Sequence, residues 1–212
     1  RMLNRRHLLA ASASAAGLGF LGRAQAQSPA AIQARLVYDE IFEGMLAADP
    51  LNASGLGLDT GRRAVLKTKV GDRSAAGRMG PFQPFIDARA KLKAVDRSGL
   101  SERDLTQYDT VVWLADHCAE AQRFDFAGVD SYDYPVPYVL SQLTGSYQEV
   151  HDALATKHVI QTREDCEAYL ARLQDFGRAL GDEIDRAKEN AARGIVPPDF
   201  VLDKALAQLK AL

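Results

Sequence analysis

Histidine is the residue type best suited to acid–base chemistry and metal binding near neutral pH, and this chain has four. They are His7, His117, His151 and His158. A zinc site usually needs three or four ligands at recognisable spacing, and neither H-E-x-x-H nor C-x-x-C occurs in the chain. His151 and His158 would share a helix face only if one helix continued through both, so we interpret them as solvent-facing or end-of-helix residues. We therefore expect no catalytic, metal or cofactor-binding residue in this segment.

The two cysteines, Cys118 and Cys166, offer a second kind of chemistry. His117 beside Cys118 would point to another side of its helix, which is poor geometry for a catalytic thiol. In an oxidising compartment, a disulfide between the two cysteines would join two predicted helices. The alternative is that both are small buried apolar side chains. Nucleophilic serine and phosphate-binding motifs are absent, because the chain contains neither G-x-S-x-G nor a glycine-rich loop with a lysine.

The segment from Phe124 to Tyr138 is rich in aromatic residues and prolines placed among acidic residues. Long aromatic connections can line substrate clefts, which makes Tyr132, Tyr134 and Tyr138 candidates for a substrate-binding wall. The alternative is that these rings fix an extended connection onto the helices.

The elements that must position these residues are predicted to be helices. Ser28-Pro29, Ser101 and Thr162 are typical of helix starts, and Ser146-x-x-Glu149 is typical of a capping box. A further helix is predicted to end near Val95, with Pro81 and Pro84 starting or kinking it, whereas residues 51–61 are predicted to be a turn-rich connection. No alternating strand pattern is present, so the predicted fold class is all-α.

The longest predicted helix begins after Thr162 and is stopped by Gly194. Its length, about 45 Å for about 30 residues, predicts an elongated helical bundle. A last helix after Pro197-Pro198 keeps helical spacing up to Leu212 with no cap, so residues 27–212 are interpreted as a helical domain truncated within its last helix, the N-terminal part of a larger, mostly helical protein. Apolar residues spaced three and four apart predict a lengthwise packing seam on the long helix: Cys166, Tyr169, Leu173, Phe176, Leu180, Ile184, Ala187 and Ala191.

Residues 1–26 have the pattern of an export signal. Arg5 and Arg6 precede an apolar stretch, and Ala24 and Ala26 are the small residues that a signal peptidase reads. The paired arginines and the modest hydrophobicity are typical of a twin-arginine signal, which predicts recognition by the twin-arginine export machinery and a periplasmic or otherwise exported bacterial protein. The apolar stretch is too short and too diluted by small residues for a stable membrane anchor.

Charge and composition exclude other classes of protein. Apolar residues make up 47% and charged residues 25% of the chain, values typical of a folded soluble domain. Without the first 26 residues, 22 basic and 28 acidic side chains remain, a net charge of −6. This acidic balance argues against nucleic acid as a partner.

Across residues 28–212, the order and spacing of several segments resemble the bacterial "domain of unknown function 885" (DUF885) family. The segments are LGLD at 56–59, YVLSQLTG at 138–145, TREDCEAYLARL at 162–173 and GIVPPDFVLDKALAQL at 194–209. Members of this family are longer, mostly helical proteins that are similar to zinc metallopeptidases of the gluzincin type. In such enzymes an H-E-x-x-H helix supplies two zinc ligands and a general base.

The resemblance implies that the catalytic residues lie beyond Leu212, so none is assigned here, and zinc is implied only for the full-length parent. The chain would then be the N-terminal non-catalytic portion of an exported zinc metallopeptidase-like hydrolase. It would form a wall or lid of the peptide cleft, contact the missing C-terminal portion and be inactive alone. The alternative is a non-enzymatic periplasmic binding or scaffold module. A third reading, a small complete protein, requires a Cys118–Cys166 disulfide.

Overall fold

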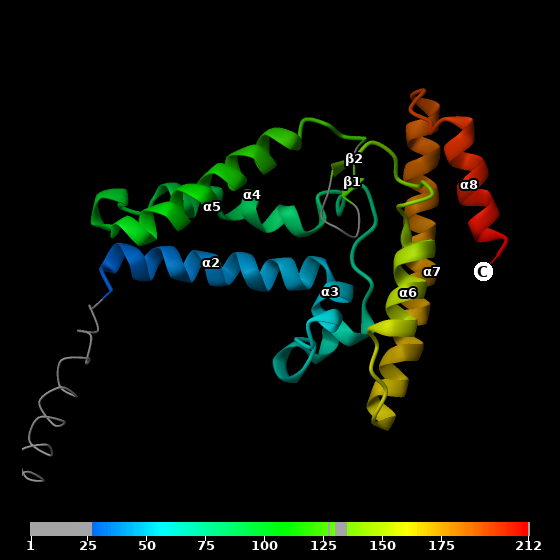
Figure 1. Cartoon of the computed structure of the whole chain (residues 1–212), viewed down its shortest axis with the longest axis horizontal. Helices are drawn as coiled ribbons and strands as arrows, with labels where there is room; N and C mark the ends of the chain where they lie inside the picture. Colours follow the sequence, from blue (N-terminus) through cyan, green and yellow to red (C-terminus); the bar gives the residue numbers. More distant parts are fainter. Residues whose placement is uncertain (1–26, 127, 130–134, 212) are drawn as a thin grey trace, which may run out of the picture.

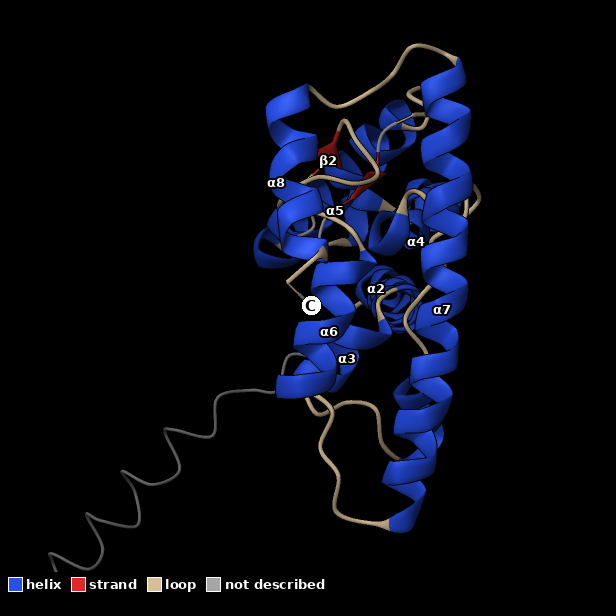
Figure 2. Ribbon diagram, turned by 90° about the vertical axis from the view of Figure 1, so that its right-hand side faces the viewer, coloured by secondary structure: helices blue, strands red, loops and turns tan. Residues whose placement is uncertain are grey.

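The structure is a computed structural model that describes residues 27–126, 128–129 and 135–211. Apart from two two-residue strands, the regular secondary structure of the described chain is helical, which confirms the predicted all-α class. One group of helices lies on one side of the molecule, and a second group runs across it on the other side (Figure 1, Figure 2). The first group is α2 (Pro29–Ala48), α4 (Gln83–Lys93) and α5 (Glu102–Ala121), and the second is α6 (Ser146–Thr156), α7 (Arg163–Ala192) and α8 (Asp199–Leu209).

Shorter elements lie between the two groups and within the first. Strands β1 (Gly128–Val129) and β2 (Pro135–Val136) pair antiparallel, with Gly128 opposite Val136. None of the helices in the described ranges is both long enough and apolar enough to cross a membrane. The remaining elements are the α-helix α3 (Pro50–Gly55) and the 3₁₀-helices η1 (Gly61–Thr68), η2 (Gly80–Phe82) and η3 (Arg97–Gly99).

Three of the predicted helix starts are confirmed by their cap hydrogen bonds. The hydroxyl groups of Ser28 and Ser101 accept from the backbone N–H three residues ahead, at 3.1 and 3.2 Å. Thr162 and Asp165 form a reciprocal capping box at the start of α7. Each cap lies within one turn of the residues that it satisfies, which is why the sequence pattern predicts it.

Residues 51–61 are not only a turn-rich connection, because they overlap α3. Asp49 ends α2 and at the same time caps α3, where its Oδ1 accepts from the Asn52 N–H at 3.0 Å. Pro50 occupies the first turn of α3, as Pro29 does in α2. The prediction is wrong here because α3 is only six residues long, too short to show a helical period, and glycines at 55 and 57 at its end are typical of turns.

The predicted capping box at Ser146 is also wrong, although a helix does begin there. No side chain caps α6 from within the helix. The hydroxyl of Ser146 donates instead to Glu183 of α7, and Glu149 pairs with Arg73. The side chains of Ser146 and Glu149, which a capping box would use within α6, both bind residues that are distant in the sequence.

Each helix group has its own hydrophobic core. In the first, Ile41 of α2 packs with Leu92 of α4 and Ala115 of α5. In the second, Val150 of α6 packs with Ala179 of α7. Leu51 of α3 and Val70 belong to this second core, so the chain between α2 and α4 joins the two groups.

The predicted apolar seam of α7 is only partly buried. Leu173 and Ile184 are 39% and 48% exposed, and Cys166 is exposed as well. The buried positions also recur at helical spacing but carry a different set of side chains, most of them polar: Arg172, Ala179, Glu183 and Asn190. The apolar seam and the mostly polar set of buried residues both have helical periodicity on α7. The polar set faces inward because its side chains find hydrogen-bonding partners on neighbouring segments.

Candidate functional site

The three histidines in the described chain lie on different segments and have different surroundings. His117 of α5 donates from Nδ1 to the Trp113 carbonyl at 2.7 Å and stacks on the Trp113 ring. His151 is exposed on α6. His158 directly follows the end of α6 and is buried, so of the two alternatives the end-of-helix position is correct for this residue and the solvent-facing one is wrong. Within residues 27–126, 128–129 and 135–211, no three His, Cys, Asp or Glu side chains are grouped to hold a metal, so the zinc implied by the family resemblance has no ligand set there.

A buried network around Arg172 accounts for His158. Arg172 is fully buried, and its Nη1 lies 3.2 Å from His158 Nδ1. A guanidinium can only donate, so His158 Nδ1 must accept and the ring proton sits on Nε2, which donates to the Asp165 carbonyl at 3.1 Å. This assigns His158 as neutral, and burial lowers its pKa from 6.5.

The same network contains serine and aspartate but is not arranged for nucleophilic catalysis. Arg172 Nη2 donates to Ser54 Oγ at 2.8 Å, and Ser54 Oγ donates to Asp59 Oδ2 at 2.7 Å. His158 contacts Arg172 rather than Ser54, so no histidine is placed to take the proton of the hydroxyl, and Asp59 accepts its hydrogen bond instead. Arg172 also donates to the Leu66 carbonyl, so the network joins α3, η1 and α7.

The disulfide considered from the sequence is not formed. Cys118 and Cys166 are both free, the first buried against the α2–α4–α5 core and the second exposed. Burial raises the pKa of the Cys118 thiol, which keeps it protonated. The reading of two buried apolar cysteines is therefore correct for Cys118 and wrong for Cys166.

Several other residues singled out from the sequence lie outside the described part of the chain. These are Arg5, Arg6, Ala24 and Ala26 of the export signal and Tyr132 and Tyr134 of the aromatic segment. Tyr138 is described and half-buried.

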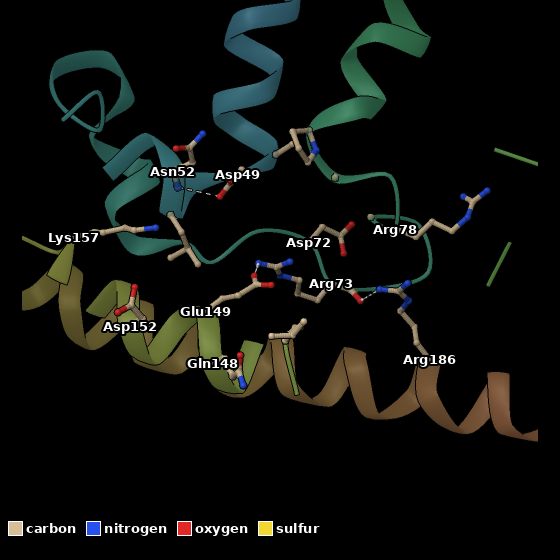
Figure 3. A pocket seen from close by; sticks show the side chains of 16 residues that line it. Asp49, Asn52, Asp72, Arg73, Arg78, Gln148, Glu149, Asp152, Lys157 and Arg186 are labelled. Atoms are coloured by element: carbon tan, nitrogen blue, oxygen red, sulfur yellow. Dashed lines mark hydrogen bonds and ion pairs between the residues drawn. The ribbon is translucent and has the colours of Figure 1, made fainter. Parts of the chain in front are cut away.

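The strongest candidate site is a charged cleft between the two helix groups, which sequence reasoning did not find. It has a cavity volume of about 370 Å³, within the range of ligand pockets. Lys157 lies at one end of it and Arg78 at the other (Figure 3). Cations and carboxylates are equally represented in its lining: Arg73, Arg78, Lys157 and Arg186 against Asp49, Asp72, Glu149 and Asp152.

Hydrogen bonds and ion pairs hold the middle of the charged cleft. Arg73 Nη2 and Glu149 Oε2 are 2.7 Å apart, which ties the loop before α4 to α6 (Figure 3). Arg186 of α7 reaches the same loop, where its Nη1 donates to the Arg73 carbonyl at 3.2 Å. Burial lowers the pKa of Arg186, while the charge of Glu183 opposes this shift and the charges of Arg73 and Arg78 add to it. Arg73 is therefore held between α6, through its guanidinium, and α7, through its backbone carbonyl.

Behind the charged cleft, α7 holds the start of α6 in place. Glu183 is 3% exposed, and both of its carboxylate oxygens accept from the Ser146 backbone N–H, at 2.9 and 3.0 Å. Burial raises the pKa of Glu183, while the hydrogen bonds from Ser146 and the charge of Arg73 oppose that rise. Because Glu149 is in the first turn of α6, this contact also positions the carboxylate that pairs with Arg73.

The sequence contained only an indirect signal for the charged cleft. Arg186 follows the buried Glu183 by three residues on α7, and side chains at that spacing lie on neighbouring parts of one helix face. The loop that contains Asp72, Arg73 and Arg78 is irregular, and its sequence shows neither a helical nor a strand period. Residues from four separate segments meet here, and no local pattern predicts that meeting.

A comparison with protein families identifies one relationship. The model of the family described as "Bacterial protein of unknown function (DUF885)" matches residues 50–212, which is more than half of the chain. No significant similarity links the chain to a curated protein, and none links its structure to a solved one.

Proposed function

We propose that this chain, which belongs to the bacterial DUF885 family, is the N-terminal non-catalytic portion of an exported zinc metallopeptidase-like hydrolase and forms one wall of its peptide cleft. The observation that carries the proposal is the charged cleft. Its lining offers cations for carboxylates, carboxylates for ammonium groups, and the amides of Asn52 and Gln148 for peptide bonds. A peptide presents all three kinds of group.

The mixed charge favours a peptide over a simple anion or cation. Four cations and four carboxylates line the charged cleft, so a ligand carrying only one sign of charge would meet repulsion as well as attraction. A short peptide can place its ammonium end and its carboxylate end at different parts of the lining. Its uncharged backbone between them suits the polar side chains in the middle.

In this proposal the zinc and the general base belong to another part of the parent protein. The described residues provide no group of three metal ligands, so no catalytic step is assigned to them. Exposed apolar side chains on the second helix group support a packed neighbour there, because such side chains are costly to leave in water. They are Leu170, Leu173 and Ile184 on α7 and Phe200, Leu202, Leu206 and Leu209 on α8.

Export is the second part of the proposal and rests on residues 1–26. Fusing this segment to a reporter that requires twin-arginine export should place the reporter in the periplasm. Replacing Arg5 and Arg6 together by lysine should abolish that transport, whereas replacing Arg23 by lysine should leave it intact. Transport that survives the double replacement would contradict the assignment.

Peptide binding by the purified chain tests the role of the charged cleft. Calorimetry with tetraglycine, which has both charged ends and no side chains, should give saturable binding. Asp152→Asn and Lys157→Gln each remove one exposed charge from the lining, and each should weaken the binding of tetraglycine several-fold. The matched controls are Asp185→Asn and Lys188→Gln on α7, which are 77% and 74% exposed and lie outside the lining. Equal effects in both pairs would contradict a binding role.

Two further measurements separate this proposal from a non-enzymatic periplasmic binding or scaffold module. The reading frame of the parent gene should contain an H-E-x-x-H motif, and its absence would favour the binding module. The 212-residue chain should hydrolyse no peptide and hold no stoichiometric zinc. One tightly bound zinc per chain would refute the placement of the catalytic centre outside this segment.

A further inference from the structure

A second cavity, of about 420 Å³, adjoins the charged cleft and is lined by apolar side chains. We call it the apolar pocket. It lies between η2, the C-terminal half of α5 and the paired strands β1 and β2. Its large apolar side chains are Met79, Phe82, Leu114, Phe124, Phe126 and Val136.

Arg78 lines both cavities and is the point at which they meet. Its guanidinium donates to the backbone carbonyls of Gln122 and Phe124. Carbonyls are neutral acceptors, so these hydrogen bonds orient the group without cancelling its charge. The apolar pocket therefore has a fixed positive charge at its border with the charged cleft.

We propose that Arg78 and the apolar pocket together recognise the C-terminal residue of a peptide with a large hydrophobic side chain. The side chain fills the apolar pocket, the terminal carboxylate pairs with Arg78, and the preceding residues lie along the charged cleft towards Asp152, whose carboxylate can accept from the ammonium end (Figure 3). This inference rests on the proposed peptide-binding function and adds the class of peptide.

The charged cleft is the reason for choosing a peptide over another amphiphilic carboxylate such as a fatty acid. Beyond Arg78, the cavity continues with carboxylates and amides, which suit the amides and the ammonium group of a peptide. An alkyl chain would fill the apolar pocket but would leave those polar groups without a partner. A peptide should therefore bind more tightly than a fatty acid of similar apolar volume.

The chain contains two built-in reporters of the apolar pocket. Cys118 is buried in its lining, whereas Cys166 is exposed on α7 and serves as an internal control. Trp113, the only tryptophan, stacks on His117, which also lines the apolar pocket. Ligand entry should slow the alkylation of Cys118 by iodoacetamide relative to Cys166 and change the Trp113 fluorescence.

The experiment compares Gly-Gly-Phe, its C-terminal amide, Gly-Gly-Gly and decanoate on the unaltered 212-residue chain. We expect Gly-Gly-Phe to bind most tightly and to protect Cys118, and the amide to bind about tenfold more weakly because it lacks the charge that Arg78 recognises. Gly-Gly-Gly should bind without protecting Cys118. Equal affinity of acid and amide, or protection by decanoate alone, would overturn the inference.

Variants assign the effect to named residues. Ala121→Phe should fill the apolar pocket and remove the preference for Gly-Gly-Phe over Gly-Gly-Gly, whereas Ala155→Phe on the exposed side of α6 should not. Arg78→Gln should remove the preference for acid over amide, Arg78→Lys should retain part of it, and Arg103→Gln on the surface should have no effect. Retention of both preferences in Ala121→Phe and Arg78→Gln would contradict the inference.

The outcomes distinguish this inference from the function on which it rests. If Gly-Gly-Gly binds and Gly-Gly-Phe is no tighter, the charged cleft binds peptides but the apolar pocket selects nothing, and only the further inference fails. If no peptide binds to the unaltered chain, the proposed function fails and the inference fails with it.

Discussion

Glu183 of α7 caps the first turn of α6: its two carboxylate oxygens accept from the Ser146 backbone N–H at 2.9 and 3.0 Å, and Oε1 also accepts from the Ser146 hydroxyl at 2.8 Å. The residue that precedes the helix, Gly145, has no side chain to perform this role. A carboxylate also suits this position because the N-terminal end of a helix carries partial positive charge. The relative placement of α6 and α7, and with it one side of the charged cleft, depends on this contact.

Removal of the Glu183 carboxylate should therefore destabilise the fold. Glu183→Ala leaves the buried N–H of Ser146 without a partner and opens a cavity, and we expect a loss of about 2–4 kcal/mol in the free energy of unfolding. Urea denaturation followed by circular dichroism measures this loss. Glu189→Ala, at an exposed position of α7, is the control and should change stability by less than about 0.5 kcal/mol. Similar losses in both variants would refute the capping role.

Arg172 should be among the least replaceable side chains of the chain. Arg172→Ala leaves Ser54, His158 and the Leu66 carbonyl without their shared buried donor, which should cost about 3 kcal/mol or more. Thermal and urea unfolding would show the effect. Arg163→Ala removes a side chain that is 87% exposed and should cost no more than about 1 kcal/mol.

Stability should fall as the pH is lowered below about 6.5, because of His158. Burial lowers its pKa in the folded protein, so the unfolded chain takes up the proton first as the pH falls through 6.5. The folded state loses stability from there down to the lowered pKa of the folded protein, with a slope of at most about 1.4 kcal/mol per pH unit for one proton.

Urea unfolding between about pH 5 and pH 8, the range in which histidine titrates, measures this dependence. His158→Gln should flatten it, since glutamine does not titrate, while His151→Gln at the exposed position of α6 should preserve it. A slope that survives His158→Gln unchanged would assign the pH dependence to other groups.

Thiol reactivity should follow the burial of the two cysteines. The native chain should expose one rapidly reacting thiol, Cys166, and the denatured, unreduced chain should expose two. Titration with a thiol reagent, followed by peptide mapping, identifies the reacting residue. Finding no free thiol in the denatured chain would restore the Cys118–Cys166 disulfide and the reading of a small stapled protein.

Much of the helical content could be predicted from the sequence because its signals are local. Ser28, Ser101 and Thr162 each cap a helix through a bond to the residue three positions ahead, so a short pattern contains both partners. The end of α7 is also a local signal, because Gly194, just after the helix, has a φ of 78°, a left-handed conformation that glycine adopts without steric cost. The family resemblance is also a property of the sequence alone, because it lies in the order and spacing of segments.

Only the tertiary structure decided which face of α7 is buried and where a ligand can bind. Glu183 and Ser146 are 37 positions apart, and Arg172 and Ser54 are 118 apart, so no short pattern contains both partners. The inward stripe of α7 carries polar residues because each finds a hydrogen-bonding partner there, which compensates for its desolvation. The charged cleft follows from the same long-range pairings, which bring together α3, α6, α7 and an irregular loop.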